Sequence, residues 1–227
     1  MLKINKINNE ILKLNIKEYN KKYRKGYGIK YPEGHVIRHS KYFKNKKSIL
    51  DFGCGSKTHM EFFLNLGIKK IYGVDTANII NKIKSKKFKL FKIGANEDLT
   101  KLIKNKLEVI FANQVLYYLD DKTLNFYLKQ FNYLLKKNGL LYSTWLAPKH
   151  YYYYNSKKLK GTNMRKLTFN SRLKETTYIN FKNTKNIERL LVKNKFKTLH
   201  FGHYDIIMNY NEVDSGGMHY LNLSKKT

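Results

Sequence analysis

Cysteine and proline are nearly absent from this sequence of 227 residues. The single cysteine, Cys54, excludes an intramolecular disulfide and is typical of a reducing compartment, so a cytoplasmic location is expected. With one cysteine and scattered histidines there is no zinc-ligand spacing, and no metal site is predicted. The low number of prolines, two, and the absence of a Gly/Ser-rich run argue against a flexible linker. The length favours one domain with a substantial core.

Long hydrophobic runs are missing as well. No apolar run approaches the roughly eighteen residues that a spanning helix needs, so stable membrane insertion is not expected. The first six residues show neither an apolar core nor a small-residue cleavage site, and no signal peptide is predicted. Apolar residues instead recur at helical spacing over residues 2–23, which predicts one or two amphipathic helices that cap the domain.

Acidic residues are few: 16 Asp and Glu stand against 46 Lys and Arg, for a formal net charge of +30. This excess is either an electrostatic footprint for RNA, anionic sugars or a membrane surface, or the result of a composition rich in Lys, Asn, Ile and Tyr. The lysines occur in nearly every segment rather than in one cluster, which favours the compositional interpretation without excluding the other.

The most informative stretch covers residues 48–56, where a short apolar run ends in Asp51 and two glycines, Gly53 and Gly55, follow. A helical pattern begins directly behind them, so the stretch predicts a strand, a tight turn and a helix. Glycine tolerates positive φ and lets a ligand approach the bare backbone, which indicates a binding turn. Lys57 and His59, at the start of the helix, are expected to face solvent.

Two acidic residues, Asp51 and Asp75, indicate which class of ligand the turn binds. Asp51 directly precedes the turn and would repel a pyrophosphate, and Thr58 replaces the third glycine of a dinucleotide-binding G-x-G-x-x-G motif. A ligand with a cationic amino-acid end would instead be attracted by Asp51. Asp75 ends a second predicted strand twenty residues beyond Gly55, where a carboxylate can hold a ribose diol. A ribose together with a positive charge suggests S-adenosylmethionine.

The segments 49–55, 73–75 and 113–116 together resemble the class I S-adenosylmethionine-dependent methyltransferases, in particular small methyltransferase-11-like domains. The resemblance covers residues 48–145 and a carboxy-terminal strand pair. It implies a doubly wound, Rossmann-like α/β fold with a seven-stranded, mostly parallel sheet, a carboxy-terminal antiparallel pair and an amino-terminal helical cap. We therefore expect a cap and lid segment at 1–47 and a methyltransferase domain at 48–227, with a substrate-side insertion at about 147–182. Within the domain, Asp121 is expected to cap a long helix that Gly139 ends.

The resemblance also implies a set of cofactor-binding residues. Asp51 and the backbone of the turn would hold the amino-acid end, Arg38 its carboxylate, and Asp75 with Thr76 the ribose. Ala95 stands where relatives carry an acid, so the adenine contact is expected to pass to Asn96 or Glu97, although capping of a helix by Asn96 or Asp98 is the alternative. The full set is Arg38, Asp51, Gly53, Cys54, Gly55, Asp75, Thr76, Asn96, Glu97 and Asn113.

The methyl acceptor is less well specified than the cofactor. His35, in a Gly-rich segment before the first strand, and His150, in the insertion, are the candidate general bases for a hydroxyl or amine. The Gly-rich segment 26–39 resembles that of family members that act on small molecules or on sugars of surface glycans. This resemblance favours an acceptor of that type, which can be anionic. The alternatives are an RNA methyltransferase, although no Asn-Pro-Pro-Tyr motif follows the fourth strand, and a non-catalytic binding module. The sequence gives no indication of oligomeric state.

Overall fold

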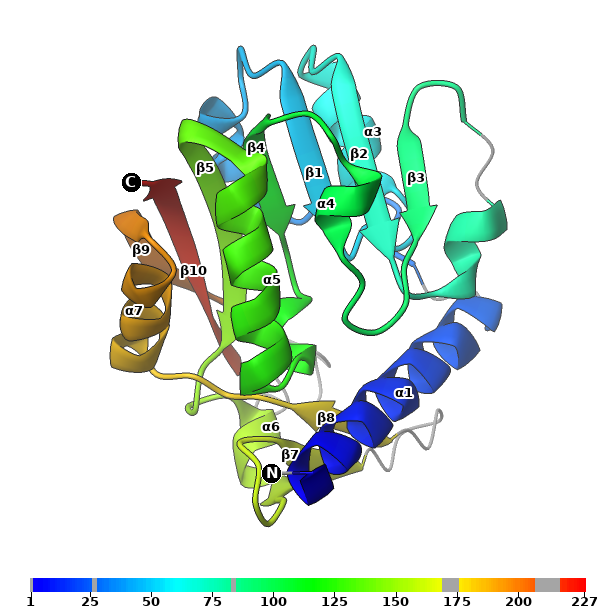
Figure 1. The fold of residues 1–227 in the computed structure, drawn as a ribbon, viewed down its shortest axis with the longest axis vertical. Coiled ribbons are helices and arrows are strands. Elements are labelled where there is room, and N and C mark those ends of the chain that lie inside the picture. Colours follow the sequence, from blue (N-terminus) through cyan, green and yellow to red (C-terminus); the bar gives the residue numbers. More distant parts are fainter. Residues whose placement is uncertain (1, 26–27, 83–84, 169–175, 207–216) are drawn as a thin grey trace.

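The computed structural model describes residues 2–25, 28–82, 85–168, 176–206 and 217–227 (Figure 1). The predicted connection between the last two strands lies largely outside these residues. None of the helices in the described part of the chain has both the length and the apolar character needed to cross a membrane.

A seven-stranded sheet forms the centre of the molecule, in the order β3-β2-β1-β4-β5-β10-β9. Strand pairing is parallel from β3 to β5, whereas β10 runs antiparallel to both β5 and β9. The predicted doubly wound sheet with a closing antiparallel pair is confirmed. The strands are β1 (Ser48–Phe52), β2 (Lys70–Asp75), β3 (Lys89–Lys92), β4 (Leu107–Ala112), β5 (Leu135–Leu146), β9 (Phe196–Ile206) and β10 (Gly217–Lys226).

Helices cover both faces of the sheet. In Figure 1, α4 (Leu99–Leu102), α5 (Asp121–Leu134) and α7 (Thr184–Lys193) lie in front, and α3 (Thr58–Asn65) lies behind. Each layer has its own apolar core, because the central strands are buried on both sides. Shorter helical segments are α2 (Gly34–Arg38), η1 (Ser40–Tyr42), η2 (Asn78–Lys82), η3 (Leu116–Tyr118) and α6 (Tyr151–Tyr154).

The boundaries of α5 differ from those expected. Asp120, not Asp121, caps the helix, because Asp120 has extended backbone angles and its Oδ1 accepts from the Lys122 N–H at 2.9 Å. The helix ends at Leu134 rather than at Gly139, since Leu135 is already extended and pairs with Leu107. The Asp121 side chain is consequently available for contacts outside the cap.

The amino-terminal residues form one long helix, α1 (Leu2–Arg24), which crosses below the carboxyl ends of the parallel strands in Figure 1. Its buried Asn15 fastens it to the domain: Oδ1 accepts from the Tyr178 N–H at 2.9 Å, and Nδ2 donates to the Tyr178 carbonyl at 3.0 Å. Ile11 and Leu12 are buried apolar residues of this helix. These contacts hold α1 over the edge of the sheet where doubly wound folds bind ligands.

Residues 147–182, expected as an irregular insertion, contain a second sheet of three antiparallel strands, β6 (Ser156–Lys158), β7 (Arg165–Thr168) and β8 (Thr176–Ile179). Leu167 and Ile179 pack with Tyr117 and Leu146 of the main domain into a small separate core. The strands are only three or four residues long, which is too short for a clear alternation of apolar and polar residues.

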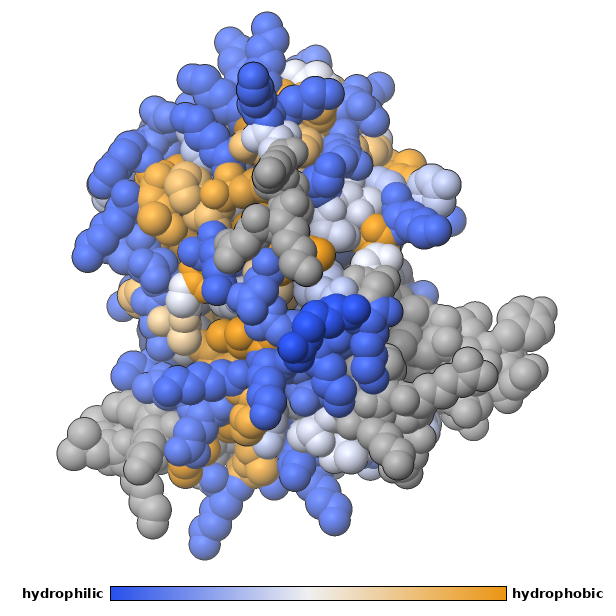
Figure 2. Space-filling model, turned by 90° about the vertical axis from the view of Figure 1, so that its right-hand side faces the viewer, coloured by the Kyte–Doolittle hydropathy of each residue, from blue (hydrophilic) through white to orange (hydrophobic). Residues whose placement is uncertain are grey.

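Hydrophilic side chains cover most of the face shown in Figure 2, which lies to the right of the view in Figure 1, and hydrophobic residues appear there in separate patches. Such a spread of hydrophilic side chains is what a composition rich in lysine and asparagine produces on any solvated surface. The charge alone therefore does not locate a site on this face.

Candidate functional site

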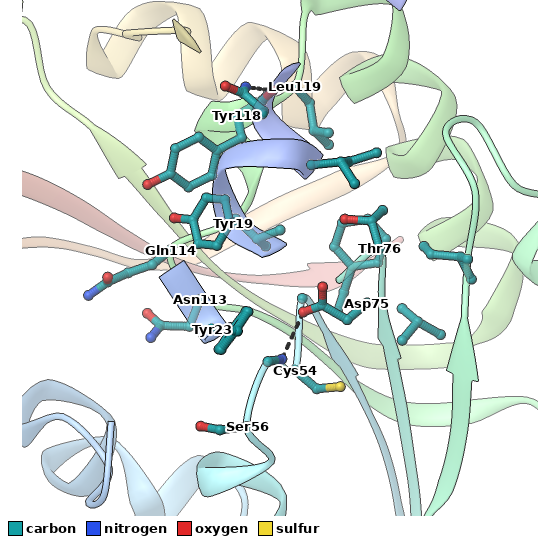
Figure 3. Close-up of a pocket in the computed structure, with 18 of the residues that line it drawn as sticks. Tyr19, Tyr23, Cys54, Ser56, Asp75, Thr76, Asn113, Gln114, Tyr118 and Leu119 are labelled. Atoms are coloured by element: carbon teal, nitrogen blue, oxygen red, sulfur yellow. Dashed lines mark hydrogen bonds between the residues drawn. The ribbon is translucent and has the colours of Figure 1, made fainter. Parts of the chain in front are cut away.

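An enclosed cavity lies between α1 and the carboxyl ends of the parallel strands (Figure 3). Its floor comes from the loops that follow β1, β2, β3 and β4, and its roof from Leu12, Tyr19 and Tyr23 of α1. Tyr19 also packs edge-on against Tyr118, with ring centroids 5.1 Å apart. The two α1 tyrosines were not predicted as site residues, although their i, i+4 spacing places them on one side of the helix.

The glycine turn has the conformation that its sequence predicts. Gly53 has φ +81° and Gly55 has φ +49°, both in the left-handed region that favours glycine. A side chain would not fit either, because a Cβ at Gly53 would lie 2.6 Å from a methyl of Val115, and one at Gly55 would meet the Tyr23 hydroxyl. Val115 and Tyr23 therefore lie directly against the turn, and a ligand that approached this backbone would contact both side chains.

Asp75 lies directly beside the turn. Its Oδ2 accepts from the Gly55 N–H at 2.8 Å, and its Oδ1 accepts from the Ala77 N–H at 2.7 Å. Burial raises the pKa of Asp75, while these backbone hydrogen bonds act in the opposite direction. The parallel pairing of β1 and β2 thus brings the turn and the predicted ribose carboxylate into contact, and Thr76 lines the same cavity.

Asp51 is buried at the end of β1, with 1% of its surface exposed. Within the described part of the chain, its Oδ2 has no hydrogen-bond partner. The pKa of Asp51 is raised to about 7, mainly by burial; His59 acts in the opposite direction, and the carboxylates of Asp75 and Glu33 add to the increase. A cationic group next to this carboxylate would offset the cost of its burial. The glycine turn and the unsatisfied acid therefore fit the amino-acid end of S-adenosylmethionine.

Glu33 is the centre of a hydrogen-bond network that the sequence did not predict. Its Oε2 lies 2.6 Å from His59 Nε2 and accepts from Asn113 Nδ2 at 3.1 Å, while its Oε1 accepts from Gln114 Nε2 at 2.8 Å. Burial acts to raise the pKa of Glu33, but the contacts with His59 and His35 outweigh it and lower that pKa. The carboxylate is consequently ionised at neutral pH and fixes the chain directly after β4.

His59 was expected to face solvent, and that expectation is wrong. Its side chain is buried against Phe111 and pairs with Glu33, because α3 turns this residue towards the sheet. Burial lowers the pKa of His59, but the hydrogen bond to Glu33 and the charges of Asp51 and Glu33 raise it overall. Lys57 does remain at the surface, where it pairs with Glu61.

His35 joins this network at the side of β9, next to Asn113 of the cavity wall but not itself among the residues that line the cavity. Its Nε2 lies 3.0 Å from Asn113 Oδ1, and the Asn113 amide nitrogen is already a donor to Glu33. We assign the proton of neutral His35 to Nε2 on this basis, which leaves the lone pair on Nδ1. Burial lowers the pKa of His35, so the ring is neutral at pH 7. Tyr204 stacks on it with ring centroids 3.8 Å apart.

His150, the second predicted base, is placed differently. Like His35 it does not line the cavity, but it is 1% exposed and its Nδ1 accepts from the Tyr152 N–H at 3.0 Å as the cap of α6. Burial lowers the pKa of His150 to about 3, and His219 lowers it further. Its acceptor nitrogen is thus occupied by the backbone, and the structure gives no support to His150 as a base.

Four predicted cofactor residues do not line the cavity: Asp51, which is buried, and three residues that lie away from the wall. Arg38 is exposed at the end of α2, because Val36 is the residue of this helix that turns inward. Asn96 is exposed with φ +60°, and Glu97 bends back so that its Oε2 accepts from the Gly94 N–H at 3.3 Å. Gly94 and Ala95 line the cavity instead. Cys54 and Asn113 line it as expected, so the correction concerns Arg38, Asn96 and Glu97.

Comparison with known proteins identifies the family. A family model described as a methyltransferase domain matches residues 24–200, well over half of the chain. A search of curated proteins finds no match.

Solved structures share the fold at low sequence identity. An S-adenosylmethionine-dependent methyltransferase from Anabaena variabilis has a TM-score of 0.69 and 13% identity, with 96% of this chain and 95% of that chain covered. One from Archaeoglobus fulgidus has a TM-score of 0.61 and 17% identity, with coverage of 85% and 91%. A Burkholderia thailandensis 1,6-didemethyltoxoflavin-N1-methyltransferase, solved with its namesake compound and S-adenosylhomocysteine, has a TM-score of 0.56 and 13% identity, with coverage of 85% and 76%. The match of residues 24–200, together with the fold, places the chain in the methyltransferase-domain family as a class I enzyme with S-adenosylmethionine as its cofactor.

Proposed function

We propose that the enzyme methylates an oxygen or nitrogen of a small-molecule or saccharide acceptor inside the enclosed cavity. One observation carries this proposal: among the described residues that line the cavity there is no lysine or arginine, in a chain that contains 46 of them. An RNA strand would need cations beside the reacting base to neutralise its phosphates. A neutral or cationic acceptor suits this wall, so the cavity favours a small molecule over RNA and an uncharged acceptor over an anionic one.

The proposed cofactor contacts come from the first two strands. Gly53 and Gly55 would hold the amino-acid end against Asp51, and Asp75 with Thr76 would hold the ribose. S-adenosylmethionine supplies a methyl group on a positively charged sulfur, which is already a good leaving group. The protein therefore has two remaining tasks, to align the acceptor and to remove its proton.

His35 is the proposed base. Its Nδ1 lone pair would accept the proton of the acceptor hydroxyl or amine, and its lowered pKa keeps that lone pair available at neutral pH. Asn113 orients the ring through Nε2, and Glu33 in turn fixes Asn113. The stacked ring of Tyr204 excludes water from one face of the imidazole. Asn113 and Glu33 act as positioning residues in this scheme.

The test is transfer of labelled methyl groups from S-adenosylmethionine to an extract of the source cells, followed by separate treatment with ribonuclease and with glycosidases. We expect label in low-mass compounds or in material released by glycosidases, and much less label with His35→Asn. Label that becomes soluble only after ribonuclease treatment would contradict the proposal and support the RNA alternative.

A further inference from the structure

A second hollow lies on the outer side of the molecule, where the start of α5, the β6–β7 strands and α7 meet. It shares no lining residue with the enclosed cavity. We call it the cationic groove and define it by six side chains: Lys122, Lys158, Arg165, Lys182, Arg189 and Lys193. The residues come from separate elements of the chain, so the tertiary fold brings these charges together.

Acidic partners are few in the groove. Among the described lining residues, Asp121 is the one carboxylate, and it is already engaged. Its Oδ1 accepts from Lys182 Nζ at 2.5 Å and from Asn180 Nδ2 at 2.8 Å, and its Oδ2 accepts from Asn163. One carboxylate cannot offset six positive charges. The groove therefore carries an excess of positive charge, which an anion bound in it would offset.

The arginines separate this groove from the general excess of lysine. The whole sequence contains five arginines among its 46 cationic residues, and two of these five, Arg165 and Arg189, line the groove. A composition that favours lysine does not by itself place arginines together. Arginine differs from lysine in its planar fork of N–H donors, which matches two oxygens of a phosphate at once.

Arg165 is held in a fixed position. Its Nε donates to Ser156 Oγ at 2.8 Å, and its Nη2 donates to the carbonyls of Ser156 at 2.6 Å and Tyr153 at 3.2 Å. The guanidinium also lies over the Tyr153 ring, 4.2 Å from its centroid. These bonds leave Nη1 without a partner in the described part of the chain. The protein has thus ordered this side chain in advance, which lowers the entropic cost of binding an anion.

The excess of positive charge is smaller in the adjoining hollow. This second hollow shares Lys122 and Lys158 and adds Lys160, but it also contains Asp120 and Asp121. Charge therefore falls off along the surface, whereas a nucleic-acid strand needs a continuous cationic track. The groove itself has a volume of about 790 Å³, within the roughly 300–1,000 Å³ of small-molecule sites. A compact ligand suits these dimensions better than a long chain.

We propose that the cationic groove is a second binding site, separate from the active site, for a small ligand that carries a phosphate or pyrophosphate group. Arg189 binds the phosphate oxygens as a fork, Arg165 donates to them from Nη1, and the surrounding lysines supply neutralising charge. The ligand is either a free phosphate compound or a nucleotide, whose base and sugar would occupy the rest of the groove.

Calorimetry on the full chain tests this proposal with three probes: inorganic pyrophosphate, a nucleoside diphosphate and a single-stranded oligonucleotide. We expect pyrophosphate to bind at one site. Equal affinity for the nucleotide indicates recognition of the phosphates alone, and tighter nucleotide binding adds a contact to the base or sugar. Arg189→Gln should weaken either ligand about tenfold or more, whereas Lys69→Gln, an exposed lysine before β2, should change nothing.

Arg165→Lys keeps the charge but removes the Nη1 donor that the protein holds in place, so it should weaken binding about threefold or more while S-adenosylmethionine binding stays at the wild-type value. That second measurement verifies that each variant is folded. Absence of pyrophosphate and nucleotide binding, or equal losses with Lys69→Gln and Arg189→Gln, would overturn the proposal. So would tight oligonucleotide binding that pyrophosphate does not compete with, because the groove would then belong to a nucleic-acid surface.

Discussion

The enclosed cavity and the cationic groove carry opposite charges in one chain. Glu33, Asp51 and Asp75 lie at or directly behind the cavity wall, which has no lysine or arginine among its described residues. The groove gathers six cations around one engaged acid. The comparison teaches that the rare residue types are the informative ones here. Carboxylates and arginines are scarce in this sequence, so their placement indicates a site where the abundant lysines do not.

The largest expected effect concerns His35, the neutral histidine that contacts Asn113 at the edge of the cavity. His35→Asn removes the proposed base and should lower kcat about 10²- to 10⁴-fold, the usual contribution of a general base. Binding of S-adenosylmethionine should stay within about twofold, since His35 is not assigned to the cofactor. Steady-state kinetics and calorimetry measure the two quantities, with His203→Asn, an exposed histidine of β9, as the control.

The pH profile provides a further check on His35. Because burial lowers its pKa, the acidic limb of kcat/KM should lie below pH 6.5, the ordinary value for histidine, with activity lost as the pH falls through that limb. Unchanged kcat in His35→Asn, or an acidic limb well above neutrality, would contradict the assignment.

The second effect concerns the ribose carboxylate. Asp75→Ala should weaken S-adenosylmethionine binding about 10- to 150-fold, the usual loss for a charge-assisted hydrogen bond of about 1.5–3 kcal/mol. Glu61→Ala, an exposed acid on α3 that removes the same charge, is the matched control and should have no effect. If both variants weaken binding equally, the cavity attracts the cofactor through general charge and not through Asp75.

Asp51 should produce a smaller and pH-dependent effect. Its pKa in the folded protein is about 7, above the ordinary value of 3.8, so its contribution to stability is complete below about pH 4 and is lost as the pH rises to about 7. Asp51→Asn should therefore match the wild type in acid and exceed it near neutrality, by up to about 1.4 kcal/mol per pH unit across that window.

Asp51→Asn is expected to change the stability of the apoprotein and its affinity for the cofactor in opposite directions. An amide at position 51 cannot carry a charge, so Asp51→Asn should bind the cationic cofactor several-fold more weakly at neutral pH, although the apoprotein is more stable. Thermal melts from about pH 4 to 8, together with calorimetry, test both statements. A melting temperature that falls in parallel for both proteins would show that Asp51 does not titrate in this range.

The smallest expected effect concerns Asp121, the acidic residue of the cationic groove. Asp121→Asn removes the acid of the cationic groove, so pyrophosphate binding should tighten by about two- to threefold, whereas the equivalent change at Asp51 weakens binding of a cation. Lys182 loses its ion pair, and a modest decrease in melting temperature is expected. A calorimetric titration at low salt resolves the change, and weaker pyrophosphate binding would count against the charge argument.

Much of the cofactor-binding part of the site was predictable from the sequence, because it depends on residues that are close together in the chain or in neighbouring strands. The glycine turn depends on backbone conformations that glycine favours, and Asp75 follows from the parallel pairing of β1 and β2. The acceptor half was not predictable to the same degree. Glu33 contacts residues 26 to 81 positions away in the chain, and no periodicity or motif reports a contact at such distances. His150 looked equivalent to His35 in the sequence, yet a backbone N–H occupies its acceptor nitrogen.

The sequence by itself determined the sheet, the glycine turn and the acid beside it, because short-range geometry and the alternation of buried strands dictate them. Only the tertiary structure decided which side chains share a wall. It turned Arg38 to solvent, buried His59 against Glu33 and collected Arg165 and Arg189 in one groove. The physical reason is that a backbone motif uses atoms of adjacent residues, whereas a side-chain network depends on how separate elements pack.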